Sequence, residues 1–169
     1  MNTNEEILDL VDEADNVIGE VPRNLANADP KYIHREVAVI IYDGEKILFQ
    51  LRSKKKKVLP NEWMISCAGH VGKGSNPEDV AHSELKEELD FDADLKYWLK
   101  ERVNLPSESR FFYVYTGKYN GEEVILDPEE SDDYKFLNIE EYKKMLLEGI
   151  KFSEFSMSLV ERFWRDKSN

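Results

Sequence analysis

Short hydrophobic runs separated by turn-forming residues dominate the first third of the chain. Residues 6–23 (EILDLVDEADNVIGEVPR) predict two short strands joined by a turn at Ala14-Asp15-Asn16, and residues 25–31 predict a loop. Within residues 32–52, the runs VAVIIY and KILFQL predict a β-hairpin, because the intervening Asp43-Gly44 favours a type I′ turn. The first of these runs is continuously apolar, which is typical of a central strand covered on both faces.

The rest of the pattern mixes strands and helices. Strands are expected at residues 63–67, 94–103, 110–119, 122–126 and 134–137, with loops at 53–60 and 127–133 and a hairpin-type turn at Asn120-Gly121. Helices are expected at 139–148 and at 153–165, where Phe155, Leu159, Val160 and Phe163 form one apolar face. This order predicts an α+β fold in which a mixed β-sheet lies between helices.

Composition limits the classes of function. The 169 residues predict a single domain over 1–169, with residues 1–25 as an N-terminal β-hairpin extension. The net charge of −12 argues against nucleic acid as a partner. No apolar run reaches the length of a membrane span, no signal peptide is recognised, and Cys67 has no second cysteine to pair with. We therefore expect no membrane partner and a cytoplasmic protein.

Residues 69–91 (GHVGKGSNPEDVAHSELKEELDF) predict a glycine-containing loop followed by a short acidic helix. Asn76 is a suitable N-cap and Pro77 suits the first helical position. Glu84, Glu87 and Glu88 are spaced three and four residues apart, so their carboxylates lie on one face and repel one another. Two interpretations follow: a solvated acidic face, or a site for a hard divalent ion such as Mg²⁺.

The spacing in this segment resembles the Nudix box, which reads Gly, five residues, Glu, seven residues, then Arg-Glu-apolar-any-Glu-Glu-any-Gly-apolar. Six positions match: Gly69, Glu84, Leu85, Glu87, Glu88 and Phe91. The resemblance implies a Nudix-type α/β/α sandwich and a catalytic metal site with Mg²⁺, or Mn²⁺, held by Glu84, Glu87, Glu88 and Gly69.

Three positions depart from that pattern, since Ser75 replaces a Glu, Ser83 the Arg, and Asp90 a Gly. In the family the Glu and the Arg look like a pair that ties the loop to the helix. Their joint loss leaves no unpaired charge. Asp tolerates the left-handed backbone better than most residues, which makes Asp90 a plausible substitute for Gly. The box is thus altered in its scaffold and complete in its metal-binding glutamates.

The resemblance implies a Mg²⁺-dependent pyrophosphohydrolase that cleaves a small diphosphate compound, such as a nucleoside diphosphate linked to another group. Substrate-binding candidates are Arg52, Lys54 and Lys57, and the acidic loop contributes Glu129 and Glu130 as candidate distal carboxylates. The Lys54–Lys57 run and the acidic loop can equally be solvated segments. The loss of the family's Glu and Arg, replaced by Ser75 and Ser83, motivates an alternative, a Nudix-fold binding module with weak or no turnover. The sequence is compatible with a homodimer and does not decide the oligomeric state. No segment identifies the substrate.

Several segments also resemble the isopentenyl-diphosphate isomerase-like subgroup: LVDEADNVIGE, YIHREVAV, SCAGH and FSEFSMSLV. That resemblance matches His34, His70 and Glu108 to metal-binding positions. It places the isomerase's catalytic cysteine at Ala68 and its catalytic glutamate at Arg110. The acid–base pair is therefore missing, and isomerase activity is not expected. Cys67 is interpreted as a buried structural residue, and the two histidines as hydrogen-bonded residues or ligands.

Overall fold

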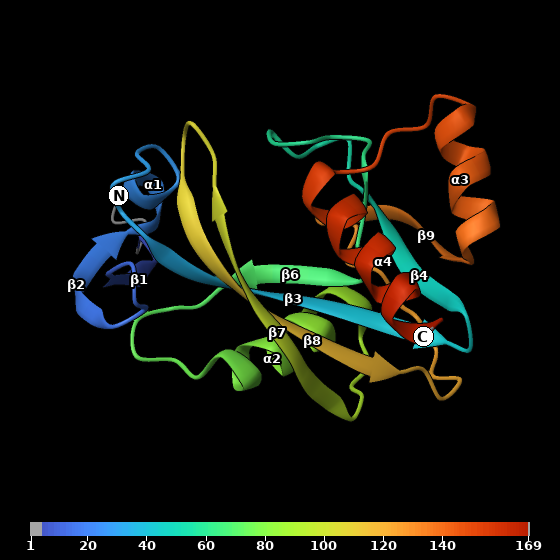
Figure 1. The fold of residues 1–169 in the computed structure, drawn as a ribbon, viewed down its shortest axis with the longest axis horizontal. Coiled ribbons are helices and arrows are strands. Elements are labelled where there is room, and N and C mark those ends of the chain that lie inside the picture. Colours follow the sequence, from blue (N-terminus) through green and yellow to red (C-terminus); the bar gives the residue numbers. More distant parts are fainter. Residues whose placement is uncertain (1–4, 169) are drawn as a thin grey trace. The chain divides into compact units, whose positions relative to one another are not determined.

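The computed structural model describes residues 5–168, which form nine strands and four helices (Figure 1). The strands are β1 (Ile7–Val11), β2 (Val17–Pro22), β3 (His34–Asp43), β4 (Lys46–Arg52), β5 (Trp63–Met64), β6 (Cys67–His70), β7 (Leu95–Asn104), β8 (Ser109–Lys118) and β9 (Ser131–Leu137). The helices are α1 (Arg23–Ala26), α2 (Pro77–Leu89), α3 (Ile139–Leu147) and α4 (Glu154–Lys167). Within the described part of the chain, no helix is both long and apolar enough to cross a membrane.

Strands β1 and β2 form a two-stranded antiparallel sheet, and the other strands form a sheet of order β5-β4-β3-β8-β7, with β6 paired to β3 and β9 to β4. Strand β4 pairs antiparallel with β3, β5 and β9. At the ends of β3 and β8, Tyr119 N donates to Tyr42 O at 2.8 Å, so these two strands run in the same direction. The predicted α+β fold with a mixed sheet is confirmed.

The chain packs as two compact units. The first comprises residues up to Ala38 together with Ala68–Ala81 and Tyr97–Tyr115. The second comprises Val39–Cys67, His82–Lys96 and the chain from Thr116 onward.

In the first unit, the turn between β1 and β2 is fixed by Asp15. This residue has a φ of +64°, and its largely buried carboxylate accepts hydrogen bonds from Arg35 Nε (2.7 Å), Lys100 Nζ (2.9 Å) and the Tyr113 hydroxyl. The predicted strand–turn–strand is confirmed. The loop expected at 25–31 is partly wrong, since α1 extends to Ala26, whose side chain is buried with Leu8 and Val21.

In the second unit, the β3–β4 hairpin has the expected strands and a different turn. Tyr42 pairs with Ile47 and Asp43 with Lys46, so the two central residues are Gly44 and Glu45. Only Gly44 has a positive φ (+58°). A type I′ turn requires positive φ at both central residues, whereas a type II′ turn requires it at the first only. The prediction of a type I′ turn at Asp43-Gly44 was wrong by one residue.

Two other strand predictions need correction. The single strand expected at 63–67 is interrupted at Ser66, whose hydroxyl accepts from Ile41 N (2.8 Å) and donates to Leu48 O (2.7 Å) in place of a regular strand ladder. Residues 122–126 form no strand, because Ile125 N instead donates to Leu89 O (3.0 Å) near the end of α2. Strand β9 begins at Ser131, three residues before the expected start, and takes the end of the predicted acidic loop into the sheet.

Helices α3 and α4 confirm their predictions to within two residues at each end. Helix α4 buries Leu159, Val160 and Phe163, as the apolar stripe indicated, together with Trp164. The Trp164 indole also donates to Glu45 O at 2.8 Å. A group of stacked and edge-on aromatic rings forms the core beside these helices: Phe49, Tyr142, Phe152 and Trp164.

Candidate active site

Helix α2 forms where the sequence predicts it. Asn76 Oδ1 accepts a hydrogen bond from Glu78 N at 2.8 Å, and the helix begins at Pro77. It ends at Leu89, where Asp90 follows with a φ of +59°. The interpretation of Asp90 as a left-handed residue in the place of the family's Gly is therefore confirmed.

The carboxylates of α2 differ in their surroundings. Glu87 is exposed, whereas Glu84 and Glu88 are half-buried. Burial raises the pKa of Glu88, the negative charge of Glu84 raises it further, and the pKa reaches about 8. Glu130 acts in the same direction, while Gln50 and Arg52 oppose the shift. A fully solvated acidic face would not show such a shift, so at least Glu88 belongs to a constrained polar site.

Gln50 of β4 holds Glu88 in place. Its amide nitrogen donates to Glu88 Oε2 at 2.8 Å and to the backbone oxygen of Ser66. Its amide oxygen accepts from the Ser131 hydroxyl. Gln50 is 3% exposed, so this orientation is fixed from both ends of the amide. Gln50 was not predicted from the sequence, although a polar residue inside the apolar run KILFQL is the signal that could have identified it.

The donor set on α2 suits a hard divalent cation. Its atoms are carboxylate oxygens, which Mg²⁺ and Mn²⁺ prefer. Burial and the neighbouring charge of Glu84 disfavour the ionised form of Glu88, and a bound cation would stabilise that form. The residues of this face therefore fit the metal that the sequence motif implies. Gly69 lies in β6, and its expected part in metal binding stays a prediction.

The basic run before β5 and the acidic loop before β9 are paired with each other. Lys55 Nζ lies 2.6 Å from Glu129 Oε1, and Lys56 Nζ lies 2.8 Å from both oxygens of Glu130. Of the two acidic residues predicted for the site, Glu130 is the one whose charge acts on Glu88. Glu129 is largely exposed in its surface pair with Lys55.

The predicted substrate-side cations are differently placed. Arg52 contributes to the surroundings of Glu88, and its Nε donates to Val58 O at 2.7 Å, which fixes the loop after β4. The side chains of Lys54 and Lys57 are exposed, and the Lys54 backbone N donates to Asp132 Oδ2 at 3.0 Å. Binding of substrate by these three residues stays a prediction.

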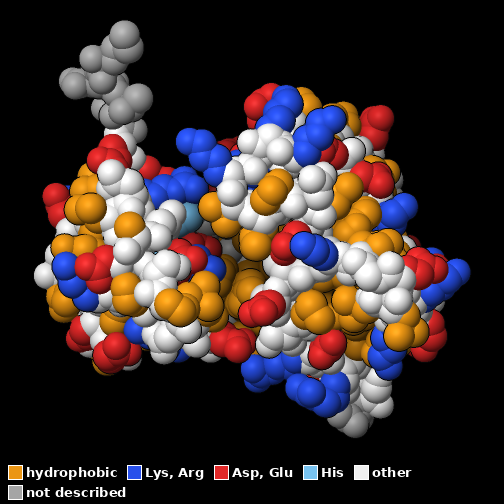
Figure 2. Space-filling view, turned by 90° about the horizontal axis from the view of Figure 1, so that it is seen from above, with side chains coloured by type: hydrophobic (Ala, Val, Ile, Leu, Met, Phe, Trp, Pro, Cys, Tyr) orange, Lys and Arg blue, Asp and Glu red, His pale blue; other side chains and the backbone are white. Residues whose placement is uncertain are grey.

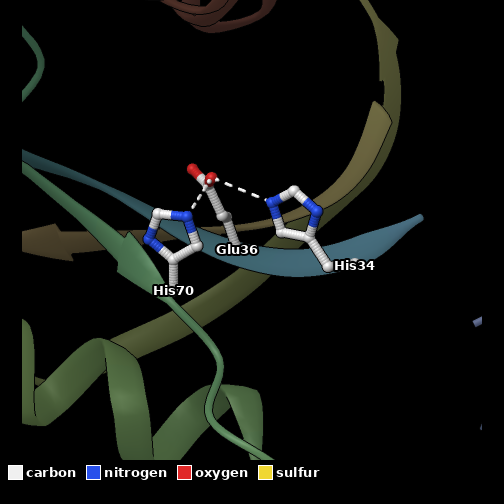
Figure 3. Close-up of side chains that lie close together, drawn as sticks. All are labelled: His34, Glu36 and His70. Atoms are coloured by element: carbon white, nitrogen blue, oxygen red, sulfur yellow. Dashed lines mark hydrogen bonds and ion pairs between the residues drawn. The ribbon is translucent and has the colours of Figure 1, made fainter. Parts of the chain in front are cut away.

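The first unit holds a separate polar group, the histidine cluster, formed by His34, Glu36 and His70 (Figure 3). Glu36 Oε1 lies 3.4 Å from His34 Nε2 and 3.2 Å from His70 Nε2, and the two imidazole rings stack with centroids 5.4 Å apart. The sequence analysis treated the histidines as hydrogen-bonded residues or ligands and did not identify Glu36, which joins them.

Two further residues border the histidine cluster. Arg110 Nη1 lies 3.1 Å from Glu36 Oε1 and 2.7 Å from Glu108 Oε2. Burial would raise the pKa of Glu36, but the hydrogen bond from His34 and the charges of His70 and Arg110 outweigh it, and the pKa falls to about 2. Burial lowers the pKa of His70 to about 4. At neutral pH, Glu36 is therefore an anion whose permanent counter-charge is Arg110.

Cys67 is 1% exposed, as its interpretation as a buried residue requires. Burial raises the pKa of its thiol well above the usual value, and the charges of Glu88 and Glu84 add to the effect. A thiol in such surroundings stays protonated.

The surface carries both signs of charge. Figure 2 shows Lys and Arg side chains interspersed with Asp and Glu over the face in view. The net charge of the sequence is −12.

Comparison with known proteins agrees with the motif. The family model described as NUDIX domain matches residues 32–155. An isopentenyl-diphosphate Delta-isomerase 2 of Photorhabdus laumondii is 33% identical over 143 residues, covering 80% of this chain and 78% of that protein. An uncharacterized Nudix hydrolase of Clostridium acetobutylicum is 30% identical over 155 residues, covering 84% and 74%.

Solved structures confirm the fold. DR0079 from Deinococcus radiodurans has a TM-score of 0.77 at 24% sequence identity, covering 93% of this chain and 98% of its own. A MutT protein from Methanosarcina mazei has a TM-score of 0.67 at 19% identity, covering 83% and 98%. Nudix enzymes generally use divalent metal ions such as Mg²⁺, in agreement with the donor set on α2. The chain therefore belongs to the Nudix family, with the hydrolases that act on diphosphate bonds.

Proposed function

We propose that this protein hydrolyses a small diphosphate compound, with a nucleoside diphosphate linked to a second group as the first substrate class to test. The observation that carries the proposal is the geometry at α2, where Gln50 holds Glu88 Oε2 at 2.8 Å beside Glu84; burial and the charge of Glu84 also raise the pKa of Glu88. A carboxylate held in this way by Gln50 is arranged to receive a cation and the phosphates that the cation brings with it.

Residues of the second unit would take three roles: binding the metal, orienting a metal ligand and attracting the substrate. Glu84, Glu87 and Glu88 would hold Mg²⁺, which supplies charge neutralisation on the diphosphate and a lowered pKa for the attacking water. Gln50 keeps Glu88 oriented through its paired hydrogen bonds to Ser66 and Ser131. Arg52, Lys54 and Lys57 would attract the phosphates of the substrate.

Glu130 is the candidate distal carboxylate. Its charge acts on Glu88, and both of its oxygens are held by Lys56 at 2.8 Å. A carboxylate in this position could accept the proton from the attacking water, provided that it parts from Lys56 when substrate binds. Glu129 is the weaker candidate, because its surface pair with Lys55 leaves it largely exposed.

Structures of other Nudix proteins indicate which compounds to test. One is the NUDIX domain of Shewanella oneidensis NrtR complexed with ADP ribose, at a TM-score of 0.65 and 12% identity. Another is a binary complex of a C. elegans Ap4A hydrolase, at 0.57 and 21%. At these identities the likeness is one of fold alone, so we take from them only that sugar nucleotides and dinucleotides belong in the panel.

Isomerase activity is not part of the proposal, although relatives carry that name. Ala68 and Arg110 stand where the resemblance places the isomerase's acid–base pair. Cys67 is buried with a raised thiol pKa, so it is not positioned to replace the missing cysteine. We expect Cys67→Ala to leave activity unchanged.

The experiment is a panel of nucleoside triphosphates, sugar nucleotides, dinucleotides and isoprenoid diphosphates, with Mg²⁺ or Mn²⁺ and release of phosphate or pyrophosphate as the readout. We expect turnover of one class by the wild type. Glu87→Gln and Glu88→Gln should each lower the rate by about 100-fold or more, because neutral amides are poorer ligands for Mg²⁺.

Glu78→Gln is the matched control, because it makes the same chemical change on the exposed first turn of the same helix, outside the box pattern. It should keep the wild-type rate. Turnover that survives in both Glu87→Gln and Glu88→Gln would remove α2 from the mechanism. No turnover across the panel would count against the hydrolase and in favour of a Nudix-fold binding module.

A further inference from the structure

The histidine cluster has the donor set of a transition-metal site. His34 Nε2, Glu36 Oε1 and His70 Nε2 lie within 4.8 Å of one another, and His34 and Glu36 are almost fully buried. His34 Nδ1 faces the backbone oxygen of Tyr32 at 3.3 Å. In the metal-free protein Nε2 donates to Glu36 Oε1, and a metal ion at this position would take the place of that proton, with Nδ1–H then donating to Tyr32 O. Metal-ligating histidines are held in this way, with the second ring nitrogen donating to a carbonyl or carboxylate.

A cation already lies against these donors. The Arg110 guanidinium is 3.1 Å from Glu36 Oε1, the same oxygen that both histidines face, and 2.7 Å from Glu108 Oε2. It thus bridges Glu36 of the cluster and the neighbouring Glu108. A guanidinium is protonated at every physiological pH, so its charge is permanent.

Arg110 is also held firmly. Its guanidinium packs over the Phe112 ring at 4.9 Å, and the side chain is largely buried. Its Nε is a buried donor with no partner among the described residues, an unfavourable arrangement that is retained because the two ion pairs fix the side chain in this pose.

We propose that Arg110 is the resident cation of the histidine cluster and that it prevents a divalent transition-metal ion from binding there. A metal ion bound to Glu36 Oε1 would lie about 2 Å from that oxygen and so within a few ångströms of the guanidinium. The repulsion between them would act at a site with little water to screen it. The cluster is therefore a latent metal site in which an arginine replaces the ion.

The test measures binding of Co²⁺, whose visible absorption reports nitrogen ligands, to the purified protein. Each protein is compared with the same protein carrying His70→Ala, and only the binding lost with His70 is counted. Metal bound at α2 is subtracted in this way, so the outcome does not depend on the proposed hydrolase. Cooperative thermal unfolding confirms that each variant is folded.

Arg110→Gln removes the charge and keeps a similar side-chain length, and Arg110→His adds an imidazole. If one of these variants does not fold, the other still allows the measurement. We expect each to bind one Co²⁺ through His70 at a concentration about 100-fold or more below the highest at which the wild type binds none, since removal of a like charge at this distance changes affinity by factors of ten. Arg110→Lys keeps the charge and should remain without Co²⁺. Arg102→Gln, which removes an arginine paired with Glu13 elsewhere in the unit, is the matched control and should behave as wild type.

His70-dependent binding of Co²⁺ to the wild-type protein would overturn the proposal, because Arg110 would then exclude nothing. Folded Arg110→Gln and Arg110→His proteins that bind no Co²⁺ through His70 would overturn it too, since the cluster would not be a latent metal site. The wild-type comparison with His70→Ala can be made whether or not any Arg110 variant folds.

Discussion

At the scale of single residues, the chemistry of α2 depends on a side chain outside the motif. The amide nitrogen of Gln50 donates to Glu88 Oε2 at 2.8 Å and to Ser66 O, and its amide oxygen accepts from the Ser131 hydroxyl. It opposes the pKa rise that burial and Glu84 impose on Glu88. Gln50 is therefore a positioning residue: it acts on a reacting diphosphate only through the carboxylate that it orients.

We expect Gln50→Leu to raise the Mg²⁺ concentration needed for half-maximal activity by about 10- to 100-fold, as loss of a hydrogen bond to a metal ligand typically does. The pH at which activity appears should also rise, because the pKa of Glu88 loses a stabilising donor. The measurement is the rate as a function of Mg²⁺ concentration at several pH values.

Ser131→Ala is the control for this prediction, because it removes an anchor of Gln50 and leaves the donor to Glu88 in place. Its effect on Mg²⁺ dependence should be several-fold smaller. A folded Gln50→Leu protein with the Mg²⁺ and pH dependence of the wild type would mean that Glu88 needs no such support.

At the scale of the elements, α3 follows β9 directly, and its start is set by a reciprocal cap. Asn138 Oδ1 accepts from Glu141 N at 2.8 Å, and Glu141 Oε2 accepts from Asn138 N at 2.9 Å. Tyr142, the fully buried residue of this helix, packs against Phe49 and Phe152 one turn later. The cap therefore fixes the register of an aromatic core residue as well as the helix end.

Asn138→Ala should lower the free energy of unfolding by about 1 kcal/mol, the usual cost of losing an N-cap. Asn138→Asp keeps an acceptor at the same position and should remain close to wild type. Urea denaturation of the three proteins measures both values. Equal stabilities for the alanine and wild-type proteins would show that packing around Tyr142 alone holds α3.

Periodicity and turn residues were sufficient to predict most of these elements, because each is stabilised by its own local pattern. Helix α2 was predicted from Asn76, Pro77 and the glutamate spacing, and α4 from its apolar stripe. The errors occur where contacts with residues distant in the sequence determine the local structure. Ser66 replaces strand pairing by side-chain bonds to β3 and β4, and residues 122–126 bond to the end of α2 instead of forming a hairpin.

The candidate site shows the same division. The box glutamates were recognised from spacing, since three carboxylates on one helix face are a local feature. Gln50 and the bridging role of Arg110 were not, because each depends on residues 16 to 81 positions away in the chain. Sequence spacing carries no information on such long-range contacts. Glu36 was missed although it lies two residues after His34 on the same strand, a spacing that places both side chains on one face.

At the scale of the whole molecule, two groups make acid unfavourable for the fold. Glu36 has a pKa of about 2 in the folded protein and an ordinary value of 4.5, so between these pH values the unfolded chain binds one more proton. His70, at about 4 against 6.5, has the same effect between pH 6.5 and 4. Taken by themselves, these two groups lower stability as the pH is lowered from about 6.5 to 2, with Glu36 alone accounting for on the order of 3 kcal/mol.

Glu88 acts in the opposite direction at higher pH. Its pKa is about 8 in the folded protein against 4.5 ordinarily, so between these values the folded state binds the extra proton. In metal-free buffer, stability should rise as the pH is lowered from about 8 to 6.5, and His70 should offset this gain below 6.5. Without Mg²⁺, the melting temperature of the wild type should thus rise as the pH is lowered from about 8 to 6.5, stay nearly level to about pH 4.5, and fall below that, where Glu36 adds to the loss at His70.

Glu88→Gln provides the decisive comparison, because an amide does not titrate. Its melting temperature should be flat between pH 8 and 6.5 and should begin to fall below about pH 6.5, because the loss at His70 is no longer offset by Glu88, whereas that of the wild type should begin to fall only below about pH 4.5. Mg²⁺ should raise the wild-type melting temperature more at pH 8 than at pH 6.5, because fewer Glu88 side chains carry a proton that the metal must displace. It should leave the melting temperature of Glu88→Gln almost unchanged. A wild-type protein whose melting temperature is flat from pH 8 to 6.5 without metal would show that Glu88 is ionised there. The raised pKa of Glu88 would then no longer account for metal binding at α2.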